Sequence, residues 1–409
     1  MYRKFILFIL AFNLQNILYA QYFTPSQLLY PYTIYPPQIV SRSAIMIDAH
    51  TGTLLYSKNP DLEIPPASLT KLMTMHLVMN EIEAGRASLE EIVPLTVDSW
   101  AQRQPEGSSL MFLEPRQIVT LREIMLGMSI SSGNDAAVAA ALRFAPTMEE
   151  FAAMMTSEAR RMGLHVTRFV ESSGISELNV TNAEEYAHFC RQYLELHPQS
   201  LNDFHSVEVF YYPMAHNVPE HLRRNLITYT HYNRNNLLRI FSGTDGLKTG
   251  FIDESGYNIA VTAQRDQTRI IAVLMGAPSQ RGGDRIRDAD TERLLTWAFE
   301  NFKTIRPEID PIENPRLWKG REKTVKLVFS EPPDFTSPID RAEKLFFTTF
   351  IPNPLIAPLQ AGYTAGYYII SDELGELRRI PLITAEAYER GNIFRRIWHS
   401  FLLLFNKNK

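Results

Sequence analysis

Three short motifs carry side chains that could together transfer an acyl group to a serine. They are Ser68-Leu69-Thr70-Lys71, Ser132-Gly133-Asn134 and Lys248-Thr249-Gly250, each present once and in this order. A serine hydroxyl is a weak nucleophile at its free pKa, so a neighbouring base must take its proton. Lys71 lies three residues after Ser68, and on a helix the two side chains would share one face. The sequence therefore predicts Ser68 as a nucleophile and Lys71 as its base.

The second and third motifs predict the groups that complete an acyl-transfer cycle. A lysine acts as a base only when its ammonium form is destabilised, and we expect burial and a second cation, Lys248, to destabilise that of Lys71. Ser132 is predicted to relay a proton to the departing amine. Asn134 is expected to hydrogen-bond both Lys71 and the amide of the substrate.

The third motif is expected on a strand that borders a cleft, because it lies between stretches of alternating apolar residues. Lys248 would supply positive charge and Thr249 a hydroxyl for a substrate carboxylate, while Gly250 leaves room for the substrate backbone. The main-chain N–H groups of Ser68 and Phe251 are predicted to hold the oxyanion.

The residues around the three motifs resemble those of one enzyme family. Ser68 follows Pro-Pro-Ala and precedes Leu-Thr-Lys-Leu-Met-Thr, Ser132 lies in Ser-Ser-Gly-Asn-Asp-Ala-Ala, and Lys248 lies in Thr-Asp-Gly-Leu-Lys-Thr-Gly-Phe. The chain thereby resembles the serine D-Ala-D-Ala carboxypeptidases, the type 5 low-molecular-mass penicillin-binding proteins. Their kind of motif trio also occurs in class A β-lactamases.

The resemblance implies an α+β protein. Its catalytic domain would be of the penicillin-binding-protein and β-lactamase-like type, an antiparallel sheet flanked by helices, followed by a small all-β domain and a C-terminal amphipathic helix. It implies removal of the terminal D-alanine from peptidoglycan pentapeptide stems through an acyl-Ser68 intermediate, without a cofactor, and covalent inhibition by β-lactam antibiotics. By position, Arg234 and Arg287 are similar to arginines that help the family hold the terminal carboxylate of its peptide.

Two positions depart from the family pattern. Ser173-Gly174-Ile175 stands where the family usually has His-Gly-Leu, and Ile252 stands where a threonine is common, second after Lys-Thr-Gly. A β-lactamase of class A needs a glutamate in Glu-x-x-Leu-Asn, and Ile175 occupies that position, which argues against this alternative. A non-catalytic wall-binding protein would be expected to lack one of the motif residues, and none is lacking. An endopeptidase that cuts D-alanyl cross-links remains open.

The elements that must position these motifs can be read from the apolar periodicity. Helices are expected at 68–85, 121–144, 148–163, 182–196 and 288–302, and strands near 44–48, 256–263 and 269–275. Helices in the middle and strands at both ends predict one antiparallel sheet made from the two ends. After Thr304, prolines break helices, and short strands are expected at 324–329, 344–350, 365–370 and 377–382.

These patterns predict five segments: a signal peptide at 1–20, a linker at 21–38, a catalytic domain at 39–303, a β domain at 304–388 and an amphipathic helix at 389–409. Arg3-Lys4 precede an apolar run from Phe5 to Phe12, and Leu18-Tyr19-Ala20 ends with a small residue suited to signal-peptidase cleavage, which is typical of an exported protein. The last segment has aromatic residues on one helical face and cations on the other, which favours a membrane-surface anchor over a helix docked on its own protein. We expect a protein held peripherally at the periplasmic or extracytoplasmic face of a bacterial inner membrane.

Composition limits the remaining function classes. The 409 residues are 45% apolar, enough for a sizeable core, and the net charge of −4 gives no reason to expect nucleic acid. Cys190 is the single cysteine, so no internal disulfide forms, and its apolar neighbours predict a packed thiol. His216 and His221 are separated by a proline-containing segment and do not predict a metal-ligand pair. No metal site is expected.

Overall fold

The structure, a computed structural model, describes residues 34–309, 312–342, 344–352 and 354–405. The chain divides into two compact units between Glu300 and Asn301. The segment expected to be a signal peptide, residues 1–20, lies outside the described residues, as do residues 21–33 of the expected linker.

The first unit is built on a five-stranded antiparallel sheet with the strand order β2-β1-β7-β6-β5. Its strands are β1 (Ser43–Asp48), β2 (Leu54–Lys58), β5 (Thr244–Ile252), β6 (Gly256–Arg265) and β7 (Thr268–Ala277). All six residues of β1 are buried, and β7 is buried except at Arg269. The prediction that the two ends of this region contribute strands to one antiparallel sheet is confirmed.

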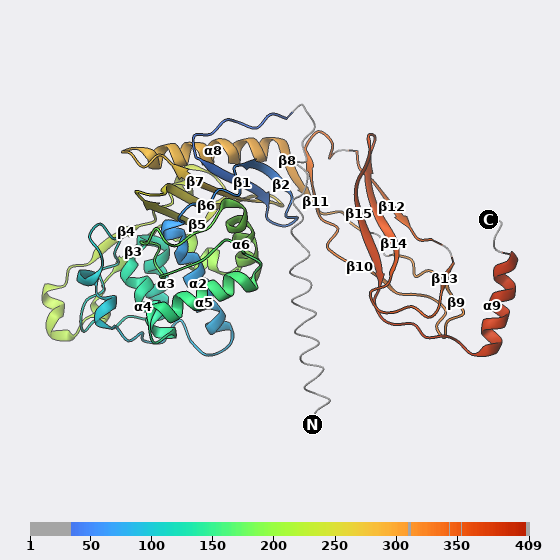
Figure 1. Ribbon diagram of the computed structural model, residues 1–409, viewed down its shortest axis with the longest axis horizontal. Helices are drawn as coiled ribbons and strands as arrows, with labels where there is room; N and C mark the ends of the chain where they lie inside the picture. The colour runs from blue at the N-terminus through green and yellow to red at the C-terminus, as the bar shows by residue number, and fades with distance from the viewer. Residues whose placement is uncertain (1–33, 310–311, 343, 353, 406–409) are drawn as a thin grey trace, which may run out of the picture. The chain divides into compact units, whose positions relative to one another are not determined.

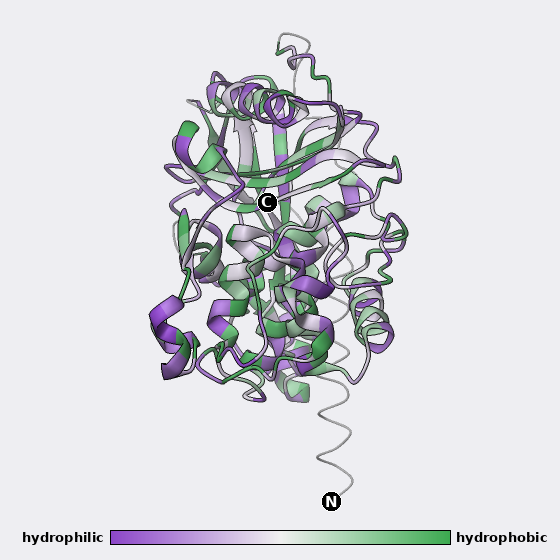
Figure 2. Cartoon of the chain, turned by 90° about the vertical axis from the view of Figure 1, so that its left-hand side faces the viewer, coloured by the Kyte–Doolittle hydropathy of each residue, from purple (hydrophilic) through white to green (hydrophobic). Residues whose placement is uncertain are grey.

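Helices cover both faces of the sheet (Figure 1). α8 (Gly283–Asn301) lies along one face. The opposite layer contains α2 (Thr70–Glu83), α3 (Leu121–Leu126), α4 (Asn134–Phe144), α5 (Met148–Arg161) and α6 (Ala183–Leu196). Three of these helices begin at capping side chains, since Thr120, Thr147 and Asn182 accept hydrogen bonds from the N–H groups of Glu123, Glu150 and Glu185. Hydrophobic residues gather on the elements at the centre of the unit (Figure 2).

Short helical turns and a hairpin complete the first unit. The turns are η1 (Ala67–Leu69), η2 (Val97–Ser99), η3 (Ala101–Arg103), η6 (Ala215–Asn217), η7 (Glu220–Asn225) and α7 (Leu237–Ile240), with two π-helical segments, η4 (Gly127–Ser131) and η5 (Leu201–His205). The hairpin pairs β3 (Val209–Tyr212) with β4 (Tyr229–Tyr232).

Two of the expected helices differ from those observed. The helix expected over 121–144 is interrupted, because the π-helical turn η4 is followed by Ser132 in the left-handed conformation, with φ 61° and ψ 32°. The chain leaves the helix there and begins α4 at Asn134 in a new direction. The helix expected over 288–302 begins earlier, at Gly283, and ends at Asn301, so Phe302 belongs to the next strand.

The second unit contains a four-stranded antiparallel sheet with the order β10-β15-β14-β12. Its strands are β10 (Leu327–Phe329), β12 (Phe346–Phe350), β14 (Thr364–Asp372) and β15 (Gly375–Thr384), and each overlaps one of the four strands expected from sequence. β8 (Phe302–Ile305) pairs with β11 (Phe335–Pro338), and β9 (Leu317–Trp318) pairs in parallel with β13 (Leu355–Ile356). Tyr368, Ile370 and Leu382 lie in its apolar core.

The second unit ends in the helix α9 (Ile393–Phe405), whose polar side contacts the unit. Arg395 donates hydrogen bonds to the carbonyl oxygens of Arg321 and Glu322 at 2.8 and 3.0 Å. His399 Nδ1 accepts one from the N–H of Lys319 at 2.8 Å. Seven apolar residues of the helix are each at least half exposed: Ile393, Phe394, Ile397, Trp398, Phe401, Leu404 and Phe405. The helix therefore leaves its apolar face uncovered by the described residues.

Candidate active site

The structure brings Ser68 and Lys71 into hydrogen-bonding contact. Ser68 lies in η1, directly before α2, and Lys71 lies in the first turn of that helix. Lys71 Nζ is 3.0 Å from Ser68 Oγ. Lys71 is fully buried, whereas Ser68 is half-buried and lines a cleft. The predicted nucleophile is therefore open to a substrate while the predicted base is not.

The surroundings of Lys71 favour the uncharged amine. Its Nζ lies 2.8 Å from Asn134 Oδ1 and 2.6 Å from the carbonyl oxygen of Ser173, both of which can only accept. A neutral amine satisfies both with its two hydrogens and keeps its lone pair for the Ser68 hydroxyl. Burial lowers the pKa of Lys71 to about 7, although the carboxylates of Glu171 and Asp135 act against this.

Lys248 is a second buried lysine of this site. Its Nζ lies 2.9 Å from Ser132 Oγ and 2.8 Å from the carbonyl oxygen of Thr249. Burial, followed by the charge of Lys71, lowers the pKa of Lys248 well below its usual range. The sequence predicted that Lys248 is the cation that helps burial to lower the pKa of Lys71. In the structure this cation is Arg234.

Ser132 and Asn134 depend on the break between η4 and α4. Ser132 has a left-handed backbone conformation. This conformation costs energy for a residue with a side chain, so the surrounding structure must hold it there. The turn directs Ser132 Oγ to Lys248, and it starts α4 with the Asn134 side chain at Lys71. Asn134 Nδ2 donates to Ser108 Oγ at 3.1 Å. Its oxygen therefore meets Lys71 as expected, and its nitrogen is held by Ser108.

The third motif lies on β5, the edge strand of the sheet next to η1. A Cβ atom at Gly250 would lie 2.8 Å from the carbonyl oxygen of Pro66 and 3.0 Å from the nitrogen of Ser68, so only glycine allows this approach. Thr249 is buried at the cleft, and the ring of Phe251 stacks on Tyr257 with 4.3 Å between centroids. The N–H groups of Ser68 and Phe251, the predicted oxyanion donors, thus belong to two backbone segments in direct contact.

Arg234 and Arg287 both line this cleft, which has a volume of about 880 Å³. Arg234 donates from Nε to the carbonyl oxygen of Ser131 at 3.2 Å, and Arg287 is buried beside Asp288, 2.5 Å away. Desolvation lowers the pKa of Arg234. The structure therefore gathers all ten of the candidate residues in one site: Ser68, Lys71, Ser132, Asn134, Arg234, Lys248, Thr249, Gly250, Phe251 and Arg287.

Glu171 is a residue of this site that sequence reasoning missed. Its carboxylate accepts hydrogen bonds from the N–H and hydroxyl of Ser173, both at 2.6 Å, from the N–H of Gly174 at 2.7 Å and from Asn179 Nδ2 at 2.8 Å. Glu171 thereby shapes the loop whose Ser173 carbonyl contacts Lys71. The departure from the family pattern at Ser173 was the available signal, because a serine there gives Glu171 an additional hydroxyl donor.

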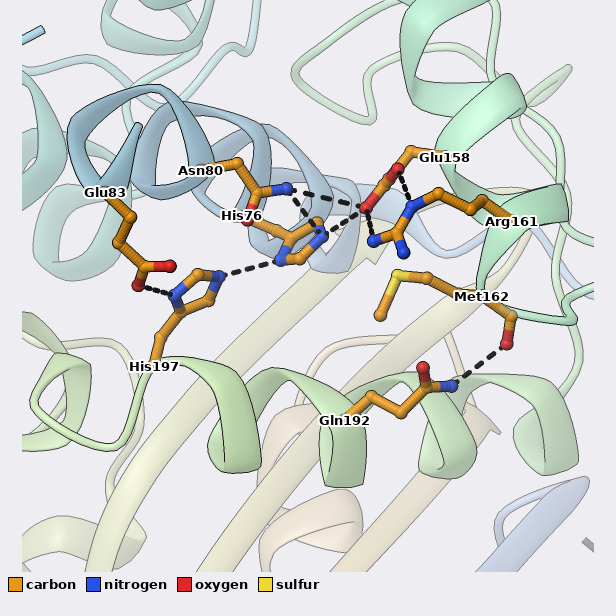
Figure 3. Close-up of polar contacts among 8 residues, drawn as sticks. All are labelled: His76, Asn80, Glu83, Glu158, Arg161, Met162, Gln192 and His197. Atoms are coloured by element: carbon orange, nitrogen blue, oxygen red, sulfur yellow. Dashed lines mark hydrogen bonds and ion pairs between the residues drawn. The ribbon is translucent and has the colours of Figure 1, made fainter. Parts of the chain in front are cut away.

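A second group that the sequence did not reveal is a chain of polar side chains around the buried His76 and His197 (Figure 3). His76 on α2 contacts His197 at 2.9 Å and Glu158 on α5 at 2.7 Å, and His197 contacts Glu83 at 2.7 Å. Arg161 binds both oxygens of Glu158. These contacts fasten α2, which carries Lys71, to α5 and to the end of α6. No pattern in the sequence indicated that His76 and His197 would meet.

The contacts of Cys190 and His216 indicate structural roles for both residues. Cys190 is fully buried and burial raises the pKa of its thiol, which confirms the prediction of a packed thiol. His216 Nε2 lies 3.0 Å from Glu123. Among residues 34–309, 312–342, 344–352 and 354–405, no three His, Cys, Asp or Glu side chains are grouped so that they could hold a metal ion.

Comparisons with known proteins identify two matching families. Residues 31–279 match D-alanyl-D-alanine carboxypeptidase, and residues 299–390 match penicillin-binding protein 5, C-terminal domain. The chain is 30% identical to D-alanyl-D-alanine carboxypeptidase DacC of Escherichia coli K12, over 94% of this chain and 93% of the relative.

Solved structures of similar proteins agree with these matches. Penicillin binding protein 5 from Haemophilus influenzae has a TM-score of 0.77 at 26% identity, over 87% of this chain and all of that one. Penicillin-binding protein D2 from Listeria monocytogenes, solved in an ampicillin-bound form, has a TM-score of 0.54 at 26% identity and covers 64% of this chain and all of that one. The fold predicted from sequence, with its C-terminal β region, is confirmed.

Proposed function

The chain belongs to the D-alanyl-D-alanine carboxypeptidase family, and from this premise we propose how its own residues carry out the reaction. The protein is a penicillin-binding serine peptidase that removes the terminal D-alanine from peptidoglycan stem peptides. The observation that supports the assignment of roles best is the contact between Ser68 Oγ and a buried lysine amine whose pKa is about 7. Ser132 in the same cleft also contacts a buried lysine, Lys248, but Ser132 is itself buried, whereas Ser68 is half-buried.

Acylation begins when Lys71 takes the proton of Ser68, whose oxygen attacks the carbonyl carbon of the penultimate D-alanine. The N–H groups of Ser68 and Phe251 stabilise the resulting oxyanion. Ser132 then gives its proton to the leaving nitrogen and regains one from the Lys71 ammonium or from Lys248, 2.9 Å away. The peptide bond breaks, D-alanine leaves, and the rest of the peptide remains esterified to Ser68.

Deacylation uses the same groups with water in the place of the amine. The water gives a proton to the base, Lys71, and its oxygen attacks the ester carbon. Ser68 then leaves as the protonated hydroxyl. Lys248, Thr249 and Arg234 are proposed to hold the terminal carboxylate before the first step, with Arg287 beside them. The enzyme is regenerated without any change in its charge.

A β-lactamase would need a base that activates water rapidly against the penicilloyl ester. Glu171 is the carboxylate nearest to Lys71 in the loop, but its oxygens already accept four short hydrogen bonds from that loop. This supports a slow-turnover target of penicillin over a drug-hydrolysing enzyme. An endopeptidase acting on D-alanyl cross-links uses the same groups and is separated only by substrate.

The test compares Ser68→Ala with Ser109→Ala, a serine that lines the same cleft. We expect Ser68→Ala to lose labelling by a fluorescent penicillin and release of D-alanine, while Ser109→Ala keeps both. Intact-mass spectrometry should show one long-lived penicilloyl adduct on the control. Labelling of Ser68→Ala at the wild-type level would refute the assignment. Incubation with pentapeptide and with cross-linked muropeptide distinguishes the carboxypeptidase from the endopeptidase.

We also propose that the protein is exported and that α9 holds it on a membrane surface. Arg395 and His399 face the unit, so the polar side of the helix is the docked side and the aromatic side is exposed. A helix docked only for structural reasons would bury its apolar side. None of the helices in the described part of the chain is long and apolar enough to cross a bilayer. This arrangement supports a helix that lies in the interface, with its apolar face in the lipid.

Flotation with anionic vesicles tests the anchor. Removing residues after Glu389, or introducing a charge by Phe401→Glu, should release the protein, whereas D-alanine release from a soluble peptide stays unchanged. Leu374→Glu is the matched control, because it places the same charge at a residue of the second unit that is 82% exposed and lies outside α9. If wild type fails to float, or if Phe401→Glu floats as well as wild type, α9 is not an anchor.

A further inference from the structure

The cleft carries more positive charge than one terminal carboxylate requires. Besides Arg234 and Arg287, it is lined by Arg281 and Arg285, which lie at the start of α8. Asp284 is the only acidic residue that lines it, and neither of these two arginines has an ion-pair partner among the described residues. Both are exposed to solvent. A pair of unpaired guanidinium groups at one wall of a cleft is suited to bind an anion.

The position of this pair relative to Ser68 indicates which part of the substrate it meets. The terminal carboxylate is proposed to bind near Lys248 and Thr249, and the scissile carbonyl between the N–H groups of Ser68 and Phe251. The half of the peptide that stays on the enzyme must then extend beyond Phe251, toward the end of β5.

The start of α8 lies at this same end of the strand. Phe251 is paired in register with Tyr257, and their rings stack. A Cβ atom at Gly283, in the first turn of α8, would lie 2.8 Å from the ring of Tyr257. Arg281 and Arg285 stand two residues before and after Gly283. They therefore lie near Phe251, past which the acyl half of the substrate extends.

We propose that Arg281 and Arg285 form a second anion subsite, which selects stem peptides that carry a free carboxylate on the acyl side of the scissile bond. The inference rests on the proposed function, because it takes the orientation of the peptide from the roles of Ser68 and Thr249. The substrate class is a peptide ending in D-Ala-D-Ala whose preceding residue has a carboxylate on its side chain. The corresponding peptide with lysine at that position, which has the same length but lacks the carboxylate, is the poorer substrate.

The experiment uses a pair of peptides that differ only in this carboxylate, with diaminopimelate or lysine before D-Ala-D-Ala. Release of D-alanine by the full chain gives kcat/KM for each. We expect wild type to prefer the carboxylate peptide by roughly five- to tenfold at low salt, and the preference to shrink as salt is added. Arg281→Gln with Arg285→Gln should remove it by lowering kcat/KM for that peptide alone. Arg285→Glu should reverse it.

Two controls separate the possible failures. Arg224→Gln removes a charge from an exposed arginine on η7 that does not line the cleft, and it should leave the preference unchanged. Acylation by benzylpenicillin should be the same in all variants, which shows that the fold and Ser68 are intact. Equal kcat/KM of wild type for the two peptides, or equal losses on both in the double variant, overturns the subsite but keeps the proposed function. Failure of wild type to release D-alanine from either peptide overturns both.

Discussion

The pKa of Lys71 predicts how the acylation rate depends on pH. A shift from 10.5 to about 7 means that the protein destabilises the ammonium form by about 5 kcal/mol, because one pKa unit is about 1.4 kcal/mol. The neutral fraction is then about one tenth at pH 6 and about nine tenths at pH 8. We expect the second-order rate constant for acylation of Ser68 by benzylpenicillin to rise about tenfold between these values and to level off above pH 8.

Two charge changes should move this midpoint in opposite directions. Glu171→Gln removes a carboxylate that raises the pKa of Lys71, so the midpoint should fall. Arg234→Gln removes a cation that lowers it, so the midpoint should rise. The midpoint of the pH–rate curve is the quantity to compare, because both variants also change the maximal acylation rate. Stopped-flow competition with a fluorescent penicillin measures the rates, and intact-mass spectrometry confirms one adduct per chain.

The same shift predicts a stability effect. Since the folded-state pKa of Lys71 lies below the unfolded value, the unfolded chain binds more protons between pH 7 and 10.5, and stability rises with pH across that window. Lys71→Met should therefore stabilise the protein at pH 6, by about 2 to 4 kcal/mol once the unpaired acceptors Asn134 and Ser173 are counted, and should abolish acylation. The gain should shrink toward pH 10. A rate that climbs tenfold per pH unit through pH 9, or normal acylation of Lys71→Met, would refute the reasoning.

Three further outcomes are expected. Burial acts to raise the pKa of Glu158, but hydrogen bonds from Arg161 and His76 lower it to about 2, so Glu158→Gln should cost about 2 to 3 kcal/mol at pH 7. Because the folded-state pKa is the lower one, this difference should fade as pH falls from about 4.5 to 2 in urea titrations, and a constant difference would contradict the assignment. Gly250→Ala should slow penicillin acylation by at least about tenfold, since its methyl group meets the backbone around Ser68, and a wild-type rate would exclude that contact. Lys248→Met should raise KM for D-alanine release more than it lowers kcat, and an effect on kcat alone would place Lys248 in proton transfer only.

Local patterns predicted the parts of the site that depend on neighbours in sequence. Ser68 and Lys71 meet because they share one helical face, and β5 was expected at a cleft because its flanks alternate. Contacts between distant residues left no comparable signal. His76 and His197 are 121 residues apart, and each lies in a helical pattern that reads as ordinary core. The break at Ser132 was missed because the residues on both sides keep helical periodicity, while the left-handed turn is imposed by the packing around it.

The expected and observed helix boundaries differ most where a glycine pair begins an element. The helix was expected to begin only at residue 288, but Gly283 starts α8 because its missing side chain lets it approach Tyr257 and the carbonyl oxygen of Pro278. That difference matters for function, because it carries the first turn of α8 to the cleft.

The turn that carries Ser68 is enclosed on two sides by glycine. A Cβ atom at Gly174 would lie 1.8 Å from the carbonyl oxygen of Ala67, and one at Gly250 would lie 3.0 Å from the nitrogen of Ser68. Ala67 itself has a φ of 50°. Any backbone shift in the loop of Gly174 therefore reaches the N–H of Ser68, the proposed oxyanion donor, directly. Antibiotic resistance obtained by remodelling this loop would be self-limiting, since a change that slows attack on a β-lactam ring would displace the same donor that the cell's own peptide needs.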